Sequence, residues 1–212
     1  MRRMPMETGY FEAYNRDNVR LVSLLDTPIE RITRTGLQTS EESFDFDVLV
    51  YATGFDVMTG AFDKIDIRGA DGQKLKEKWQ GSPTTYLGVM VNGFPNMLMV
   101  AGPQSVSGST NYPRAIEVCV DWIGALLEHA RTAGLSRLEA DVDAENTWTQ
   151  EVIDMQEAMP FSKVKSWFTG FNANVQAADA APRYIAYWGG APRYTKILNR
   201  VASEGFRDIN MD

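Results

Sequence analysis

The sequence predicts an α/β fold, because short apolar segments typical of strands are interleaved with longer segments of helical periodicity. Residues 48–52 (VLVYA) are consecutive and apolar, which suits a strand that is covered on both faces. Residues 96–101 (NMLMVA) have the same character. Three amphipathic segments follow in the second half of the chain, so the order of elements favours strands packed with helices.

The first 60 residues predict short strands that lead to a strand end with a carboxylate. Residues 18–25, 29–33 and 37–39 are expected as strands separated by turns, and residues 40–43 as a polar connector. The strand at 48–52 stops at Thr53-Gly54, where a residue without a Cβ allows a backbone or a ligand to come close. Asp56 follows at the edge where open α/β sheets bind ligands, although periodicity alone favours a core strand and its turn over a cofactor-binding edge.

Three helices are expected after the strand at 96–101. The first begins at Asn111, a suitable N-cap followed by Pro113, and ends at Gly134. The second spans about residues 144–158 and the third residues 192–205. Their expected apolar stripes contain Ile116, Val120, Ile123 and Leu127, with Cys119, Trp122 and Leu126 beside them; Trp148, Val152 and Met155; and Tyr194, Ile197, Leu198 and Val201.

The composition is that of a globular protein with one large domain or two smaller ones. Hydrophobic residues make up 44% of the 212 residues and charged residues 23%. The net charge of −7 argues against nucleic acid as a partner, since phosphates require a basic surface. We expect no membrane span and no signal peptide. The single cysteine, Cys119, fits a reducing cytoplasm, and with one histidine, His129, no metal-ligand spacing or Ser/His/Asp arrangement is present.

Several segments occur in an order that resembles a known enzyme family. They are GYFEAYNRDNVRLV (9–22), DVLVYATGFD (47–56), TGAFDKIDIRG (59–69), GFPNMLMVAGPQS (93–105), SWFTG (166–170) and YWGG (187–190). In this order and spacing they resemble the C-terminal part of the Baeyer–Villiger monooxygenases, flavoproteins with one dinucleotide-binding domain for FAD and one for NADPH. The resemblance extends from Arg2 to about Ile209.

A phosphate-binding glycine motif is missing from the sequence. G-x-G-x-x-G, whose backbone amides hold a pyrophosphate at a helix N-terminus, does not occur in the chain. The resemblance therefore implies the last two-fifths of a monooxygenase: a truncated product, an excised fragment or one half of a split enzyme. Residues 1–54 would complete the NADPH domain, and residues 55–212 would form the C-terminal part of the FAD domain. We expect the isolated chain to be inactive and to bind no FAD.

By this resemblance, two arginines at the start of the chain carry the chemistry. Arg2 and Arg3 match a basic pair in the family, where both contact NADPH. Arg3 would be the catalytic residue, since a permanently charged guanidinium stabilises negative charge that develops during oxygen transfer. The alternative is a solvated pair at a loose terminus.

Four further residues are implied to bind cofactors. Asn111 and Tyr112 match the helix start that binds FAD, through the backbone of the residue matched by Tyr112. Trp167 matches a tryptophan against the ribose and nicotinamide end of NADP, and Asp56 a carboxylate on the cofactor side. The alternatives are an ordinary capped helix, a core tryptophan and a turn residue.

The resemblance implies an FAD- and NADPH-dependent monooxygenase that uses O₂ to convert a small-molecule ketone to an ester or lactone. One alternative is a flavin monooxygenase that oxidises nitrogen or sulfur, because related chemistry uses the same scaffold. Another is a non-catalytic interaction module that complements a second chain, such as the missing N-terminal part.

Overall fold

The computed structural model describes residues 6–56, 58–106, 110–172 and 180–212. Two compact units meet in sequence at Gly54 and Phe55, the first ending at Gly54 and the second continuing to Asp212. Each unit is described by itself below.

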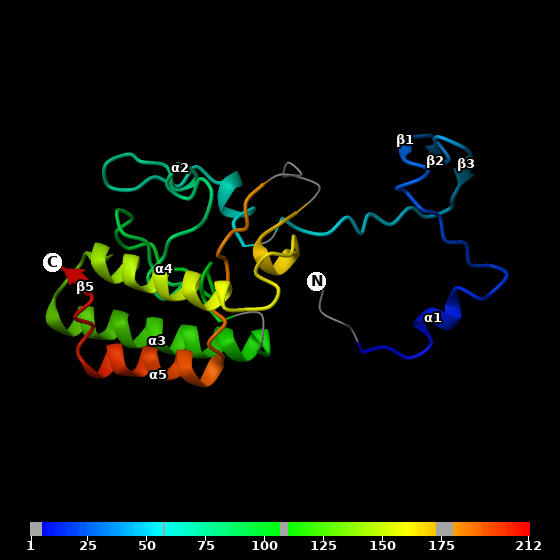
Figure 1. Ribbon diagram of the computed structural model, residues 1–212. Helices are drawn as coiled ribbons and strands as arrows, with labels where there is room; N and C mark the ends of the chain where they lie inside the picture. The colour runs from blue at the N-terminus through cyan, green and yellow to red at the C-terminus, as the bar shows by residue number, and fades with distance from the viewer. Residues whose placement is uncertain (1–5, 57, 107–109, 173–179) are drawn as a thin grey trace. The chain divides into compact units, whose positions relative to one another are not determined.

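The first unit contains a short helix and a small sheet. Helix α1 spans Tyr10–Ala13, and strands β1 (Ile29–Ile32), β2 (Gly36–Thr39) and β3 (Ser43–Asp45) form an antiparallel sheet in the order β1-β2-β3 (Figure 1). Leu37 lies opposite Phe44 in the β2–β3 pair. Gly36 is required there, because a Cβ would lie 1.9 Å from the carbonyl oxygen of Phe44. No large apolar side chain is buried among the described residues of this unit.

The strands expected at residues 18–25 and 48–52 are wrong. Both segments are irregular, and Val48 and Val50 are 76% and 77% exposed. The small sheet ends at Asp45, so residues 48–52 have no neighbouring strand among the described residues of their unit. A strand covered on both faces needs neighbours on both edges and layers on both sides, and apolar character alone supplies neither.

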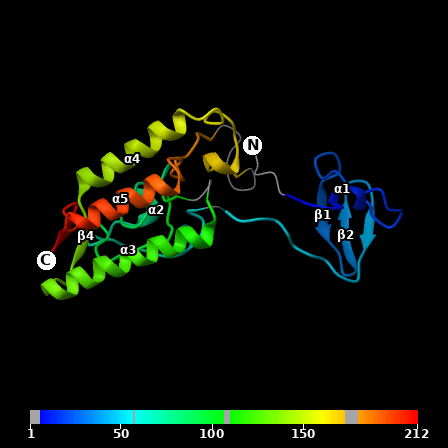
Figure 2. The same ribbon diagram turned by 90° about the horizontal axis from the view of Figure 1, so that it is seen from below.

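Three long helices dominate the second unit. Helices α3 (Tyr112–Ala133), α4 (Val142–Glu157) and α5 (Ala191–Ser203) run alongside one another (Figures 1 and 2). Helix α2 spans Leu75–Lys78, and 3-10 turns span Phe62–Lys64 and Trp167–Thr169. Strands β4 (Leu138–Ala140) and β5 (Ile209–Met211) pair antiparallel. None of the described helices has the length and apolar character needed to cross a membrane.

The expected helices are confirmed, including the ends of α3. The Asn111 side chain accepts a hydrogen bond from the Arg114 backbone N–H at 3.2 Å, and Gly134 ends the helix with φ of 72°. The buried stripe of α3 lies one position away from the main expected line, because Val120 and Leu127 are about half exposed. Ala115, Cys119, Trp122, Leu126 and Ala130 face the core instead.

The core joins α3, α4 and α5. Trp122 on α3 donates its indole N–H to the Leu198 carbonyl of α5 at 3.0 Å. Trp148 on α4 stacks on Tyr187 with ring centroids 4.9 Å apart, and its ring also meets Tyr194 of α5. These aromatic contacts bury large apolar surfaces and fix the three helices against one another.

The strand expected at residues 96–101 is also wrong. Asn96 and Ala101 have φ of 60° and 52°, a left-handed conformation that interrupts an extended strand. Asn96 bonds to Leu138 twice instead, with its backbone N–H donating to the Leu138 carbonyl and its side chain accepting from the Leu138 N–H, each at 2.8 Å. The segment is therefore held by tertiary hydrogen bonds that its apolar pattern did not reveal.

Candidate functional site

Residues 183–188 connect three segments that are far apart in the sequence. The Arg183 backbone N–H donates to the Thr169 carbonyl at 2.8 Å, which ties this segment to the turn that contains Trp167. The same segment also bonds to the loop before α3. The backbone N–H of Gln104 donates to the Ile185 carbonyl at 2.8 Å, and the backbone N–H of Tyr187 donates to the Ser105 carbonyl at 3.0 Å. The segment thus links the Trp167 turn to the loop that precedes α3.

The turn that contains Asp56 joins the same assembly through a side chain. Arg183 Nη2 donates to Thr59 Oγ1 at 2.7 Å, and Thr59 is fully buried. Gly60 is closely approached by the Asp56 side chain, since a Cβ at Gly60 would lie 2.5 Å from the Asp56 Cβ. The packing of Met58 against Ile185 strengthens this connection. The structure therefore brings the Asp56 turn and the Trp167 turn to a common segment.

Trp167 lies on the surface of this assembly. Its side chain is 50% exposed, and its ring meets the edge of Phe168 at a centroid distance of 5.8 Å. The alternative of a core tryptophan is therefore wrong, while the role of Trp167 in cofactor binding stays a prediction. The turn itself is rigidified by Thr169, whose hydroxyl accepts from the Ser166 N–H at 3.1 Å and donates to the Val164 carbonyl at 2.9 Å.

The loop before α3 is fixed by the buried side chain of Gln104. Its Nε2 donates to the Pro83 carbonyl at 2.7 Å, and its Oε1 accepts from the Thr85 N–H at 3.0 Å and the Thr149 hydroxyl at 3.2 Å. Gln104 has φ of 65°. A non-glycine residue in this conformation costs free energy that surrounding contacts must offset, and such residues cluster at functional sites.

The start of α3 retains a free backbone donor. The Asn111 side chain occupies the Arg114 N–H, Pro113 has no N–H, and nothing among the described residues accepts the Tyr112 N–H. The Tyr112 hydroxyl donates to the Ala101 carbonyl at 3.4 Å, and burial raises its pKa, which keeps the phenol neutral. A free N–H at the positive end of a 22-residue helix suits an electron-rich ring edge, so these residues fit a flavin.

Arg2 and Arg3 lie outside the described residues. The structure therefore joins the turns of Asp56 and Trp167 to the loop that precedes Asn111 and Tyr112, all in the second unit, and leaves the catalytic role of Arg3 as a prediction. Within the described ranges, no group of three or more histidine, cysteine, aspartate or glutamate side chains could hold a metal ion.

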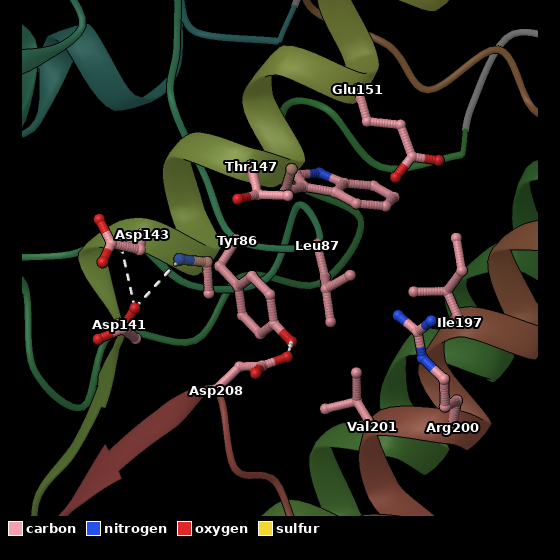
Figure 3. Close-up of a pocket in the computed structure, with 12 residues that line it drawn as sticks. Tyr86, Leu87, Asp141, Asp143, Thr147, Glu151, Ile197, Arg200, Val201 and Asp208 are labelled. Atoms are coloured by element: carbon pink, nitrogen blue, oxygen red, sulfur yellow. Dashed lines mark hydrogen bonds between the residues drawn. The ribbon is translucent and has the colours of Figure 1, made fainter.

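A cavity of about 320 Å³ lies elsewhere, between Tyr86, the start of α4 and α5 (Figure 3). Two of the acidic side chains that line it, Asp141 and Asp208, already have structural partners. Asp141 caps α4 by accepting from the N–H groups of Asp143 and Ala144, and Asp208 accepts from the Tyr86 hydroxyl at 2.7 Å. None of the predicted site residues lines this cavity, so we do not assign the function to it.

Three contributors to the site were missed in the sequence. Arg183, Thr59 and Gln104 stand in segments with no regular pattern, and their importance comes from contacts with residues 19 to 124 positions away. A weak signal was present for Gln104, because it follows Gly102-Pro103 at a chain reversal. No local signal distinguishes Arg183 from the other arginines.

The chain is similar to flavoprotein monooxygenases over almost its whole length. It is 35% identical over 210 residues to a cyclopentanone 1,2-monooxygenase of Comamonas sp., covering 99% of this chain and 38% of that protein. It is 39% identical over 201 residues to phenazine N-monooxygenase PhzNO1 of Lysobacter antibioticus, covering 93% of this chain and 36% of that protein. No protein-family model matches the chain.

Solved structures agree with the sequence comparison. A closed crystal structure of cyclohexanone monooxygenase superimposes with a TM-score of 0.88 at 36% identity, covering 100% of this chain and 39% of that one. A structure of OTEMO in complex with FAD and NADP gives a TM-score of 0.85 at 34% identity, covering 99% and 38%. The α/β class, as part of a two-domain flavoprotein, is thereby confirmed. Over 99% of its length, the chain is homologous to Baeyer–Villiger monooxygenases, of whose length it spans about 38%.

Proposed function

We propose that this chain is part of an FAD- and NADPH-dependent Baeyer–Villiger monooxygenase, which inserts one oxygen atom from O₂ beside a ketone carbonyl to give an ester or lactone. The observation that carries the proposal is the similarity to ketone monooxygenases along 99% of the chain. The hydrogen bonds that join the Asp56 turn, the Trp167 turn and the loop preceding α3 to residues 183–188 support it, because one shared site suits two cofactors that must react with each other.

The described residues have distinct roles in this proposal. When bound, the flavin supplies the oxygen chemistry. The Tyr112 backbone N–H and the positive end of α3, capped by Asn111, bind the electron-rich edge of its ring. The half-exposed indole of Trp167 offers an apolar face and an N–H donor to the nicotinamide nucleotide, with Asp56 beside the same assembly. Arg3 holds NADPH together with Arg2 and stabilises negative charge in oxygen transfer.

The two units would belong to two domains of the complete enzyme. In this proposal residues 1–54 complete the NADPH domain and residues 55–212 form the C-terminal part of the FAD domain. The first unit has no buried large apolar side chain among its described residues, and residues 48–52 expose apolar side chains. This exposed apolar surface supports a partner that covers it, namely a segment equivalent to the part of the relatives' sequences that this chain does not match. The cytoplasmic location expected from the single cysteine stays a prediction.

The test is a chimera of residues 1–212 with the remaining part of a cyclohexanone monooxygenase. We expect ketone-dependent formation of an ester or lactone, measured as product, since NADPH consumption alone also reports unproductive oxidation. Arg3→Ala should abolish product while the flavin absorbance remains, and Arg3→Lys should also fail because an ammonium lacks the planar fork of donors. Normal ester yield from Arg3→Ala would show that Arg3 is not catalytic.

Oxidation of nitrogen is the second candidate, because the phenazine N-monooxygenase is as similar to the chain as the ketone enzymes are. The same chimera distinguishes the two when it is offered a phenazine and a cyclic ketone in parallel. Formation of the N-oxide without ester or lactone would favour N-oxidation and refute the first proposal.

A further inference from the structure

Among the residues that the structure describes, no carboxylate neutralises the charge of Arg183. Its side chain is partly buried, and among the described residues no aspartate or glutamate oxygen lies within 4.0 Å of it. Its one side-chain hydrogen bond is to the neutral hydroxyl of Thr59 at 2.7 Å. This bond fixes the direction of the guanidinium and leaves most of its N–H donors free. Because a partly buried charge is costly without a counter-ion, the arrangement favours an anion.

Lys165 is a second cation that has no carboxylate partner among the described residues. Lys165 precedes Trp167 by two positions, and its Nζ lies 5.5 Å from the centroid of the Phe171 ring. A cation–π contact of this kind holds the ammonium near the turn without neutralising it. Arg183 reaches the turn through its backbone bond to Thr169. In a chain whose net charge is −7, two cations thus lie on segments that carry or contact the turn of Trp167.

The exposed indole of Trp167 narrows the class of ligand. The indole of Trp167 is 50% exposed and presents a flat apolar face with an N–H donor. Guanidinium and ammonium groups bind phosphate oxygens through charge-assisted hydrogen bonds, and the guanidinium does so with two parallel bonds. An exposed aromatic face on a turn that also carries Lys165 and contacts Arg183 matches a nucleotide, whose ring or ribose and phosphate are close together.

We propose that Arg183 and Lys165 form an anion site beside Trp167 that binds a phosphate group of the nicotinamide dinucleotide. The inference rests on the proposed function, which makes NADPH the dinucleotide. It adds that this chain itself supplies phosphate-binding residues, although it has no glycine-rich loop. Thr59 is a positioning residue, because it orients the guanidinium from the Asp56 turn.

The direct test is calorimetric titration of the whole 212-residue chain with NADP⁺, NAD⁺ and inorganic pyrophosphate, which measures the affinity for each. Arg183→Met should weaken binding of NADP⁺ at least about tenfold, the loss expected for a hydrogen bond to a charged group. Lys165→Met should weaken it less, since a more exposed charge is better screened. Arg193→Met is the matched control, because Arg193 is a surface arginine that pairs with Glu151 at 2.8 Å, and its removal should leave affinity unchanged.

The three probes identify which phosphate is bound. Equal loss of NADP⁺, NAD⁺ and pyrophosphate binding in Arg183→Met would assign the site to the pyrophosphate bridge, and loss confined to NADP⁺ would assign it to the 2′-phosphate. Arg183→Lys retains the charge and should recover part of the affinity, and a thermal melt of each variant excludes loss of fold as the cause.

Two outcomes would overturn the inference: the unaltered chain does not bind NADP⁺ or pyrophosphate saturably, or Arg183→Met binds within about twofold of it. The inference and the proposed function can fail separately. If the chimera oxygenates ketones and Arg183→Met does not change its KM for NADPH, the anion site is wrong and the function stands. If NADP⁺ binding depends on Arg183 while the chimera forms no ester or lactone, the site stands and the function is wrong.

Discussion

Replacing Gln104 tests the central claim that one buried amide holds the loop before α3. In Gln104→Leu the Pro83 carbonyl loses its donor at 2.7 Å and the Thr85 N–H loses its acceptor at 3.0 Å. Each buried backbone group left without a partner costs about 1–3 kcal/mol, so for the two groups we expect a loss of about 2–6 kcal/mol in the free energy of unfolding. The Thr85 hydroxyl adds little to this loss, because it can donate to the Pro103 carbonyl at 3.1 Å instead.

A glutamate at the same position separates hydrogen bonding from shape. A protonated Gln104→Glu side chain can still donate to the Pro83 carbonyl and accept from the Thr85 N–H, whereas an ionised one is a buried charge that faces a carbonyl oxygen. Burial therefore raises its pKa in the folded state above the ordinary glutamate value of about 4.3. The folded state then binds the proton more tightly than the unfolded state. Its stability should be greatest below about pH 4, fall as the pH rises, and level off above the folded pKa.

The assay is urea unfolding followed by tryptophan fluorescence, with each variant compared to the unaltered chain at the same pH. Gln150→Leu is the control, because Gln150 is an exposed residue of α4 that bonds only to Asp154, and it should change stability by less than about 0.5 kcal/mol. A loss below about 1 kcal/mol for Gln104→Leu would refute the reasoning. So would a Gln104→Glu variant whose relative stability is constant between about pH 4 and 8.

Other substitutions test the site and the packing around it. Trp167→Ala should weaken NADPH binding in the chimera and lower the melting temperature little. Replacement of the buried Trp122 by alanine should lower the free energy of unfolding by about 3–5 kcal/mol. A larger loss of melting temperature for Trp167→Ala than for Trp122→Ala would reject the surface position of Trp167. Gly88→Ala should destabilise the chain by at least about 1–3 kcal/mol, because Gly88 has φ of 70° and a Cβ would lie 2.5 Å from the backbone nitrogen of Ser105. Gly124 lies in an open position of α3, so Gly124→Ala should stabilise the chain by up to about 1 kcal/mol. Urea unfolding measures both changes. Burial, followed by the hydrogen bond to the Asp208 carboxylate, raises the pKa of Tyr86, so the folded state holds this proton more tightly than the unfolded state. The free energy of unfolding should therefore fall as the pH rises above about 10. In Tyr86→Phe this fall should be smaller, as measured by unfolding at alkaline pH.

The sequence predicted the helices well because helix ends depend on neighbouring residues. Asn111 and Gly134 act through hydrogen bonds and backbone angles within a few positions of themselves, so their identity is sufficient to place the ends of α3. The side of α3 that is buried was less predictable, since both stripes are apolar. Contact with α5, through Trp122 and Leu198, decided which one faces the core.

The strand predictions failed where the deciding partner is distant in the sequence. Residues 48–52 have the composition of a covered strand, but a strand exists only when other strands accept its hydrogen bonds, and the described part of its unit provides none. At 96–101, left-handed Asn96 and Ala101 and bonds to Leu138 replaced the expected extended conformation.

The sequence by itself determined the family resemblance, the three helices with the two caps of α3, and Trp167, Asp56, Asn111 and Tyr112 as candidates, because each depends on a motif or a local pattern. Only the tertiary structure decided that residues 183–188 join the Asp56 turn, the Trp167 turn and the loop before α3. It also decided that Trp167 lies on the surface and that Thr59, 124 positions away, orients the side chain of Arg183. The physical reason is that burial and the pairing of charges depend on which distant segments come into contact, and no local pattern of residues specifies those contacts.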